Sequence, residues 1–121
     1  TVSEHVSAFW DIFPTLCDIA GAPAPERDGI SMLPELTGGE QPRHEYLYWE
    51  FYWWQAPRQA ARKGGWKALR QSGPDSPMQL YHLTQDPGEQ QDLALKHPEK
   101  IAEFERIFAA AHTESELWEL I

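Results

Sequence analysis

Histidine, carboxylate and cysteine side chains are the groups with which this chain of 121 residues could bind a metal ion or transfer a proton. The five histidines are scattered along the sequence, at His5, His44, His82, His97 and His112. No two of them form the His-x-x-x-His pair that places two imidazoles on one helix face, and Cys17 is the only cysteine. The sequence therefore does not favour a zinc site.

Carboxylates gather in one short stretch, where Asp86, Glu89 and Asp92 follow Thr84. Calcium prefers such oxygen ligands, but this spacing lacks the Asp-x-Asp-x-Asp-Gly pattern of a calcium loop. The sequence Asp86-Pro-Gly-Glu89 is typical of a turn whose carboxylates bond to nearby backbone amides. We expect a turn here and no metal ion bound by this chain.

The single cysteine has no partner for an internal disulfide. Cys17 lies between Leu16 and Asp18, without an adjacent base or cation to stabilise a thiolate. We expect it to pack as a small apolar side chain rather than to act as a nucleophile.

An aromatic cluster over residues 46–54 is the one feature that could contact a ligand. Its rings can pack in a sheet core and at a domain interface, or they can stack on a sugar. Trp53 and Trp54 break the strand alternation, so we expect them in a loop. With Arg58 and His44, which could instead be solvated, they are our candidates for one wall of a substrate site.

The overall charge limits the classes of partner. Ten basic and nineteen acidic residues give a net charge of −9, which argues against non-specific binding to nucleic acid or anionic membranes. We interpret the acidity as favouring solubility. The sequence contains no apolar run long enough for a transmembrane helix and no basic and apolar signal peptide at its start.

Two helices are predicted before residue 40. Asp11 is expected to cap a helix over about 12–20 with its carboxylate, and Ser31 to cap a short helix over about 32–37. Breaker-rich residues 38–43 are our candidate boundary. The first helix has apolar residues at helical spacing, namely Ile12, Leu16, Ile19 and Ala20.

The rest of the chain predicts a small antiparallel sheet and a helix. Gly64-Gly65 suits a tight hairpin, with Arg62 and Lys67 on a solvated face. A last helix is expected over about 98–112, and its apolar stripe should cover one face of the sheet. The four strands are expected at about 45–52, 58–63, 66–71 and 78–83.

Four phrases stand in a fixed order across nearly the whole chain, at Asp11–Gly21, Asp28–Gly38, Arg62–Lys67 and Leu80–Glu89. Each is weak alone, but together they resemble the C-terminal part of sulfatases, the arylsulfatase-type hydrolases of sulfate esters. Residues 114–118 also resemble the tails of this family. His82 and Cys17 depart from the family's usual residues at their positions without weakening the resemblance.

The resemblance implies an α+β fold, a four-stranded antiparallel sheet with a C-terminal helix packed on one face. Residues 1–40 would be the helical end of an upstream α/β domain of the alkaline-phosphatase-like kind. Residues 44–121 would be the small C-terminal sulfatase subdomain.

The resemblance also implies that the catalytic machinery is encoded upstream of this chain. In the family a cysteine in a Cys-x-Pro-Ser-Arg type motif becomes formylglycine, and carboxylates hold a calcium-type divalent cation. Neither motif stands here, so we assign no catalytic or metal-binding residue. We expect a parent enzyme that hydrolyses sulfate esters and a chain that is inactive alone.

Two other interpretations stay open at this stage. The chain could be a free-standing, aromatic-rich module that binds a glycan or a protein, or the tail of a related phosphodiesterase or phosphonate hydrolase. The expected partners are the upstream catalytic domain and a sulfated carbohydrate or aryl sulfate. We also expect the isolated chain to self-associate through its first helix.

Overall fold

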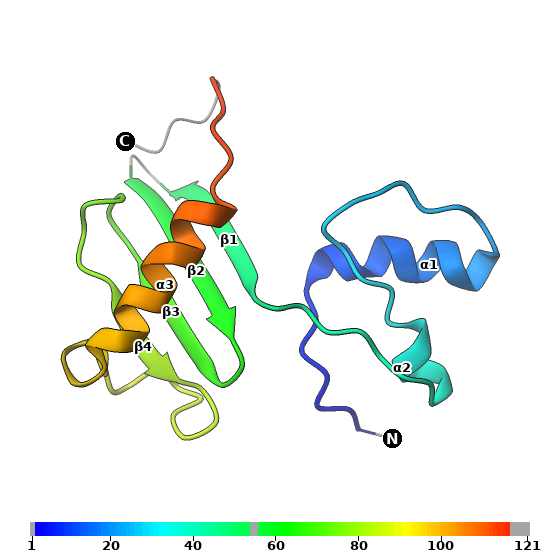
Figure 1. Ribbon diagram of the computed structural model, residues 1–121, viewed down its shortest axis with the longest axis horizontal. Helices are drawn as coiled ribbons and strands as arrows, with labels where there is room; N and C mark the ends of the chain where they lie inside the picture. The colour runs from blue at the N-terminus through cyan, green and yellow to red at the C-terminus, as the bar shows by residue number, and fades with distance from the viewer. Residues whose placement is uncertain (1, 54–55, 117–121) are drawn as a thin grey trace. The chain divides into compact units, whose positions relative to one another are not determined.

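The computed structural model describes residues 2–53 and 56–116, and the chain divides into two compact units, residues 1–45 and 46–121 (Figure 1). None of the helices formed by the described residues combines the length and the hydropathy needed to cross a lipid bilayer.

Unit 1 consists of helices and loops. A 3-10 turn, η1 (Phe9–Asp11), leads into α1 (Ile12–Ala20), and α2 (Leu33–Thr37) follows a long loop. Pro14 lies in the first turn of α1, where backbone amides have no intrahelical acceptor to lose. Among the described residues of this unit, the buried side chains are polar, Asp11 and Thr15. Unit 1 is therefore held by polar contacts rather than by an apolar core.

One face of α1 remains apolar and uncovered. The side chains of Ile12, Phe13, Leu16 and Ile19 are 41–58% exposed, at the spacing expected for one side of a helix.

Unit 2 is a four-stranded antiparallel meander in the order β1-β2-β3-β4. Neighbouring strands pair antiparallel, and Gly64 supplies the positive φ of 57° that the tight β2–β3 hairpin needs. The strands are β1 (Leu47–Trp53), β2 (Ala56–Lys63), β3 (Trp66–Arg70) and β4 (Gln79–His82).

Helix α3 (Pro98–Ala111) covers one face of this sheet, preceded by the short turn η2 (Ala94–Lys96) (Figure 1). A row of one residue from each strand, Tyr48, Ala61, Ala68 and Leu80, lies beneath it. The small alanines let Phe104, Ile107 and Phe108 of α3 approach the sheet closely, and these residues form the apolar core. The predicted α+β fold is thus confirmed.

The β1–β2 hairpin differs from the prediction. Trp53 was expected in a loop, but it is the last residue of β1 and pairs with Ala56. Strand β2 also begins before the expected residue 58 and includes Pro57. Proline is tolerated there because the β2–β3 pairing starts only at Gln59, so β2 is an edge at that point.

Candidate functional site

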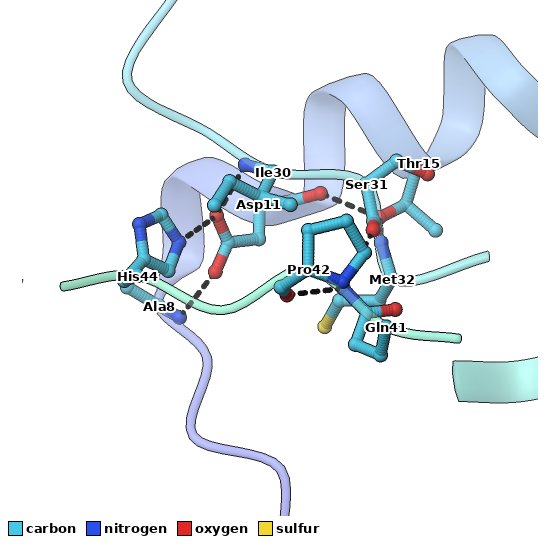
Figure 2. A network of polar contacts seen from close by, with 9 residues as sticks. All are labelled: Ala8, Asp11, Thr15, Ile30, Ser31, Met32, Gln41, Pro42 and His44. Carbon is cyan, nitrogen blue, oxygen red and sulfur yellow. Dashed lines mark hydrogen bonds and ion pairs between the residues drawn. The ribbon is translucent and has the colours of Figure 1, made fainter. Parts of the chain in front are cut away.

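Asp11 lies at the centre of a polar network in unit 1 (Figure 2). Its carboxylate is fully buried and accepts hydrogen bonds from the backbone amides of Ala8 and Ile30, each at 2.8 Å. A third contact, also 2.8 Å long, joins its Oδ1 to Nε2 of His44. The carboxylate therefore ties together three segments that lie apart in the sequence.

This arrangement corrects the expected role of Asp11 as a side-chain cap. Asp11 is the N-cap residue of α1, but its backbone is already helical and its carboxylate makes no capping hydrogen bond. The three donors described above take up its oxygens instead. Before α2, Ser31 does accept a bond from the amide of Leu33, while Met32 is the N-cap residue.

Thr15 supports the same network from one turn further along α1. Its Oγ1 donates to the carbonyl of Asp11 at 2.6 Å and accepts from the amide of Met32 at 2.8 Å. Beside these contacts, the loop between α1 and α2 passes close to the turn η1. A Cβ on Gly29 in this loop would lie 2.2 Å from the carbonyl oxygen of Trp10. The Asp11-x-x-Pro-Thr15 pattern is therefore explained by the two loop amides that it binds.

An imidazole bonded to a carboxylate is also the pair that orients a general base in hydrolases. Here the hydroxyl of Thr15 is used by two backbone bonds, so it is not free to act as a nucleophile. Burial raises the pKa of Asp11, but the donors from Ala8, Ile30 and His44 outweigh burial and lower this pKa overall. The pair is best explained as a structural clamp in which the carboxylate of Asp11 is ionised.

The four candidates for a substrate wall are not all placed as expected. His44 is not solvated, because its side chain is only 12% exposed and bonds to Asp11. Trp53 ends β1, and Trp54 lies outside the described residues. Arg58 lies opposite Phe51 in the β1–β2 register, and its Nε is buried without a hydrogen-bond partner in the described part of the chain.

A second polar network lies on the α3 face of unit 2, and the sequence analysis missed it. The hydroxyl of Tyr48 donates to Glu50 and accepts from Nε2 of Gln59 at 2.7 Å. Nδ1 of His112, at the end of α3, lies 2.9 Å from Oε2 of Glu50. Burial and the Glu50 carboxylate raise the pKa of Tyr48, which therefore stays a neutral donor. In the sequence, the signal that could have indicated this network was Glu50, a single carboxylate within the aromatic strand β1.

Neither network is arranged to bind a metal ion. In the two described segments, 2–53 and 56–116, no group of three or more His, Cys, Asp or Glu side chains could hold one. What both networks do is fix backbone segments that are distant in the sequence.

Sequence comparison finds sulfatases. The chain is 37% identical over 93 residues to the Delta 4,5-hexuronate-2-O-sulfatase of Bacteroides thetaiotaomicron, a match that covers 69% of this chain and 18% of that protein. It is 32% identical over 107 residues to the arylsulfatase K of Homo sapiens, covering 79% of this chain and 20% of that protein. No model of a protein family matches the chain.

Solved structures give the same picture of the fold. The crystal structure of Ps i-CgsB matches with a TM-score of 0.72 and 26% identity, over 88% of this chain and 24% of that one. A phosphonate monoester hydrolase of Agrobacterium radiobacter matches with a TM-score of 0.63 and 26% identity, over 90% of this chain and 24% of that one. The chain spans about a fifth of the length of the curated relatives it matches.

Proposed function

Because this chain belongs to the sulfatase family, whose C-terminal part it matches, we propose that the whole protein hydrolyses sulfate esters. The observation that carries the proposal is identity of 30% or more to several sulfatases over 69–84% of the chain. The substrate class we propose is a sulfated saccharide. One relative is named as a hexuronate sulfatase, and Ps i-CgsB has been solved in complex with k-i-k-neocarrahexaose.

The reacting groups belong, in this proposal, to the part of a sulfatase that the chain does not span. A divalent cation of the calcium type would offset the negative charge of the sulfate, and formylglycine would supply the nucleophile.

We propose that residues 1–40 complete the catalytic α/β domain and that residues 44–121 form the small C-terminal subdomain. The support lies in unit 1 itself, where the buried side chains among the described residues are the polar Asp11 and Thr15. The uncovered apolar face of α1 would then pack against the catalytic domain. When that domain is absent, the same face would drive self-association of the chain.

Within unit 2, we propose that Trp53, Trp54 and Arg58 form one wall of the substrate site. Support comes from Arg58, whose buried Nε lacks an acceptor among the described residues, because an unpaired buried donor is costly. We leave His44 out of this wall, since its bond to Asp11 explains it as part of the clamp in unit 1.

The test is an assay of the full-length protein with an aryl sulfate, and with the matching aryl phosphate as control. We expect turnover of the sulfate that a chelator abolishes, a slower reaction or none with the phosphate, and no turnover by the 121-residue chain alone. Hydrolysis of the phosphate alone would overturn the proposal in favour of a phosphate ester or phosphonate hydrolase. Turnover by the isolated chain would overturn the division of labour.

A further inference from the structure

The face of the sheet opposite α3 carries cations in an otherwise acidic chain. Side chains alternate between the two faces along a strand, and directly paired residues share a face. Tyr48 and its partner Ala61 lie under α3. Phe51 is three residues from Tyr48, so Phe51 and its partner Arg58 lie on the other face. Arg62 follows Ala61 directly, so Arg62 and its partner Lys67 also lie on that other face. We call Phe51, Arg58, Arg62 and Lys67 the cationic face.

Few carboxylates compensate these charges. Glu50 is the only acidic residue in the four strands, and it lies on the α3 side in contact with Tyr48 and His112. Lys67 is paired with Glu89 at 2.5 Å. In the described part of the chain, no carboxylate lies within ion-pair distance of Arg58 or Arg62. The face therefore keeps two uncompensated guanidinium groups although the chain has a net charge of −9.

These two arginines suit a ligand with anionic groups. A guanidinium offers a planar set of donors that matches a sulfate or carboxylate, and Nε of Arg58 is buried without an acceptor among the described residues. Phe51, beside Arg58 and 46% exposed, presents an aromatic surface next to the cation. The pair combines a stacking surface with a charge-assisted hydrogen-bond donor.

We propose that the cationic face binds an anionic oligosaccharide, with Arg58 and Arg62 each meeting one sulfate or carboxylate group and Phe51 stacking on a sugar ring. Arg58 and Arg62 stand four residues apart on one strand, a separation of about 13 Å. They can thus contact two separate groups along an extended chain. The inference rests on the proposed function for its ligand class, and it extends the proposed wall at Arg58 to a longer surface.

The test uses the 121-residue chain and a heparin-derived hexasaccharide, with the chemically desulfated hexasaccharide as its counterpart. We expect saturable binding of the sulfated sugar by calorimetry, weakened by added salt. The double variant Arg58→Gln/Arg62→Gln should weaken binding roughly tenfold or more, since it removes two charge-assisted contacts. Adding Phe51→Ala to this double variant should weaken binding of the sulfated sugar further. The control Arg106→Gln removes an exposed cation on α3 and should leave affinity unchanged.

Three outcomes would overturn the inference. They are no binding of the sulfated sugar, equal affinity for the desulfated one, and a loss as large in Arg106→Gln as in the double variant. Circular dichroism of every variant separates loss of binding from loss of fold. Turnover of a small aryl sulfate by the full-length wild-type protein tests the proposed function separately, so either idea can fail while the other stands.

Discussion

The carboxylate of Asp11 and the imidazole of His44 are 33 residues apart in the chain and meet at 2.8 Å inside unit 1. The same carboxylate holds the amides of Ala8 and Ile30. Since the described residues of this unit bury no apolar side chain, the cluster around Asp11 takes the place of a core. It fixes where the loop after α1 returns to the helix.

Replacing Asp11 by alanine should therefore loosen unit 1. The substitution leaves the partly buried amides of Ala8 and Ile30 without acceptors, and each such loss costs about 1–3 kcal/mol. Amide hydrogen exchange should be faster at Ile30 in Asp11→Ala, with little change at Leu80 in unit 2. The control Asp18→Ala removes an exposed carboxylate from the same helix. Unchanged exchange at Ile30 would show that the carboxylate does not hold the loop.

The clamp should also respond to acid. The pKa of Asp11 is lowered below 3.8 in the folded protein, so its ionisation contributes stability that is fully present above that value. This contribution is lost as the pH falls through the folded pKa. We expect the protection factor of the Ile30 amide to be constant from pH 7 to 5 and to fall below about pH 4. In Asp11→Asn the protection factor should no longer fall in acid. An identical fall in this variant would show that other carboxylates cause the loss of protection.

Gly29 should tolerate no side chain. A Cβ at this position would lie 2.2 Å from the carbonyl oxygen of Trp10, and backbone must move to relieve such a clash. Gly29→Ala should destabilise unit 1 by about 1–3 kcal/mol, the usual cost of overpacking. Gly39→Ala is the matched control, because its Cβ would come no closer than 3.5 Å to Pro34. Exchange at Met32 in the two variants gives the comparison, and equal exchange would contradict the close approach.

Phe104 should be essential to the docking of α3. Its side chain is fully buried over Ala61 and Ala68, which leave room for it on the sheet. Phe104→Ala should cost about 3–5 kcal/mol through lost burial and the cavity left behind. Leu95→Ala provides the control, because Leu95 is 100% exposed. The measurement is urea unfolding followed by circular dichroism, and a similar loss in both variants would contradict the packing described here.

Local signals in the sequence were enough to predict most helices and strands of the fold. Helical spacing of apolar residues predicted a helix over 12–20, and the structure has α1 at Ile12–Ala20. The pairing of β2 with β3 was predicted in a similar way, from the alternation of side chains along the strands and from the Gly64-Gly65 turn. These features depend on residues a few positions apart, which a single sequence displays directly.

The polar networks could not be predicted in this way. His44 and Asp11 are 33 residues apart, and His112 and Glu50 are 62 residues apart. No local spacing indicates that such side chains meet, so Asp11 was interpreted through the nearest free amides as a cap. Trp53 was misplaced for a related reason, because its position in β1 depends on pairing with Ala56 in the next strand.

The apolar face of α1 gives the last prediction, which concerns the isolated chain. Burial of apolar surface stabilises association by roughly 25 cal/mol per Å², and Leu16 and Ile19 are each 58% exposed. Sedimentation of the 121-residue chain should therefore show concentration-dependent self-association. Leu16→Lys/Ile19→Lys should abolish it, because two cations cannot be buried against a second apolar face without partners. Asp18→Lys, on the same helix, should leave association in place. A wild-type chain that stays monomeric at all concentrations would show that this face needs no cover.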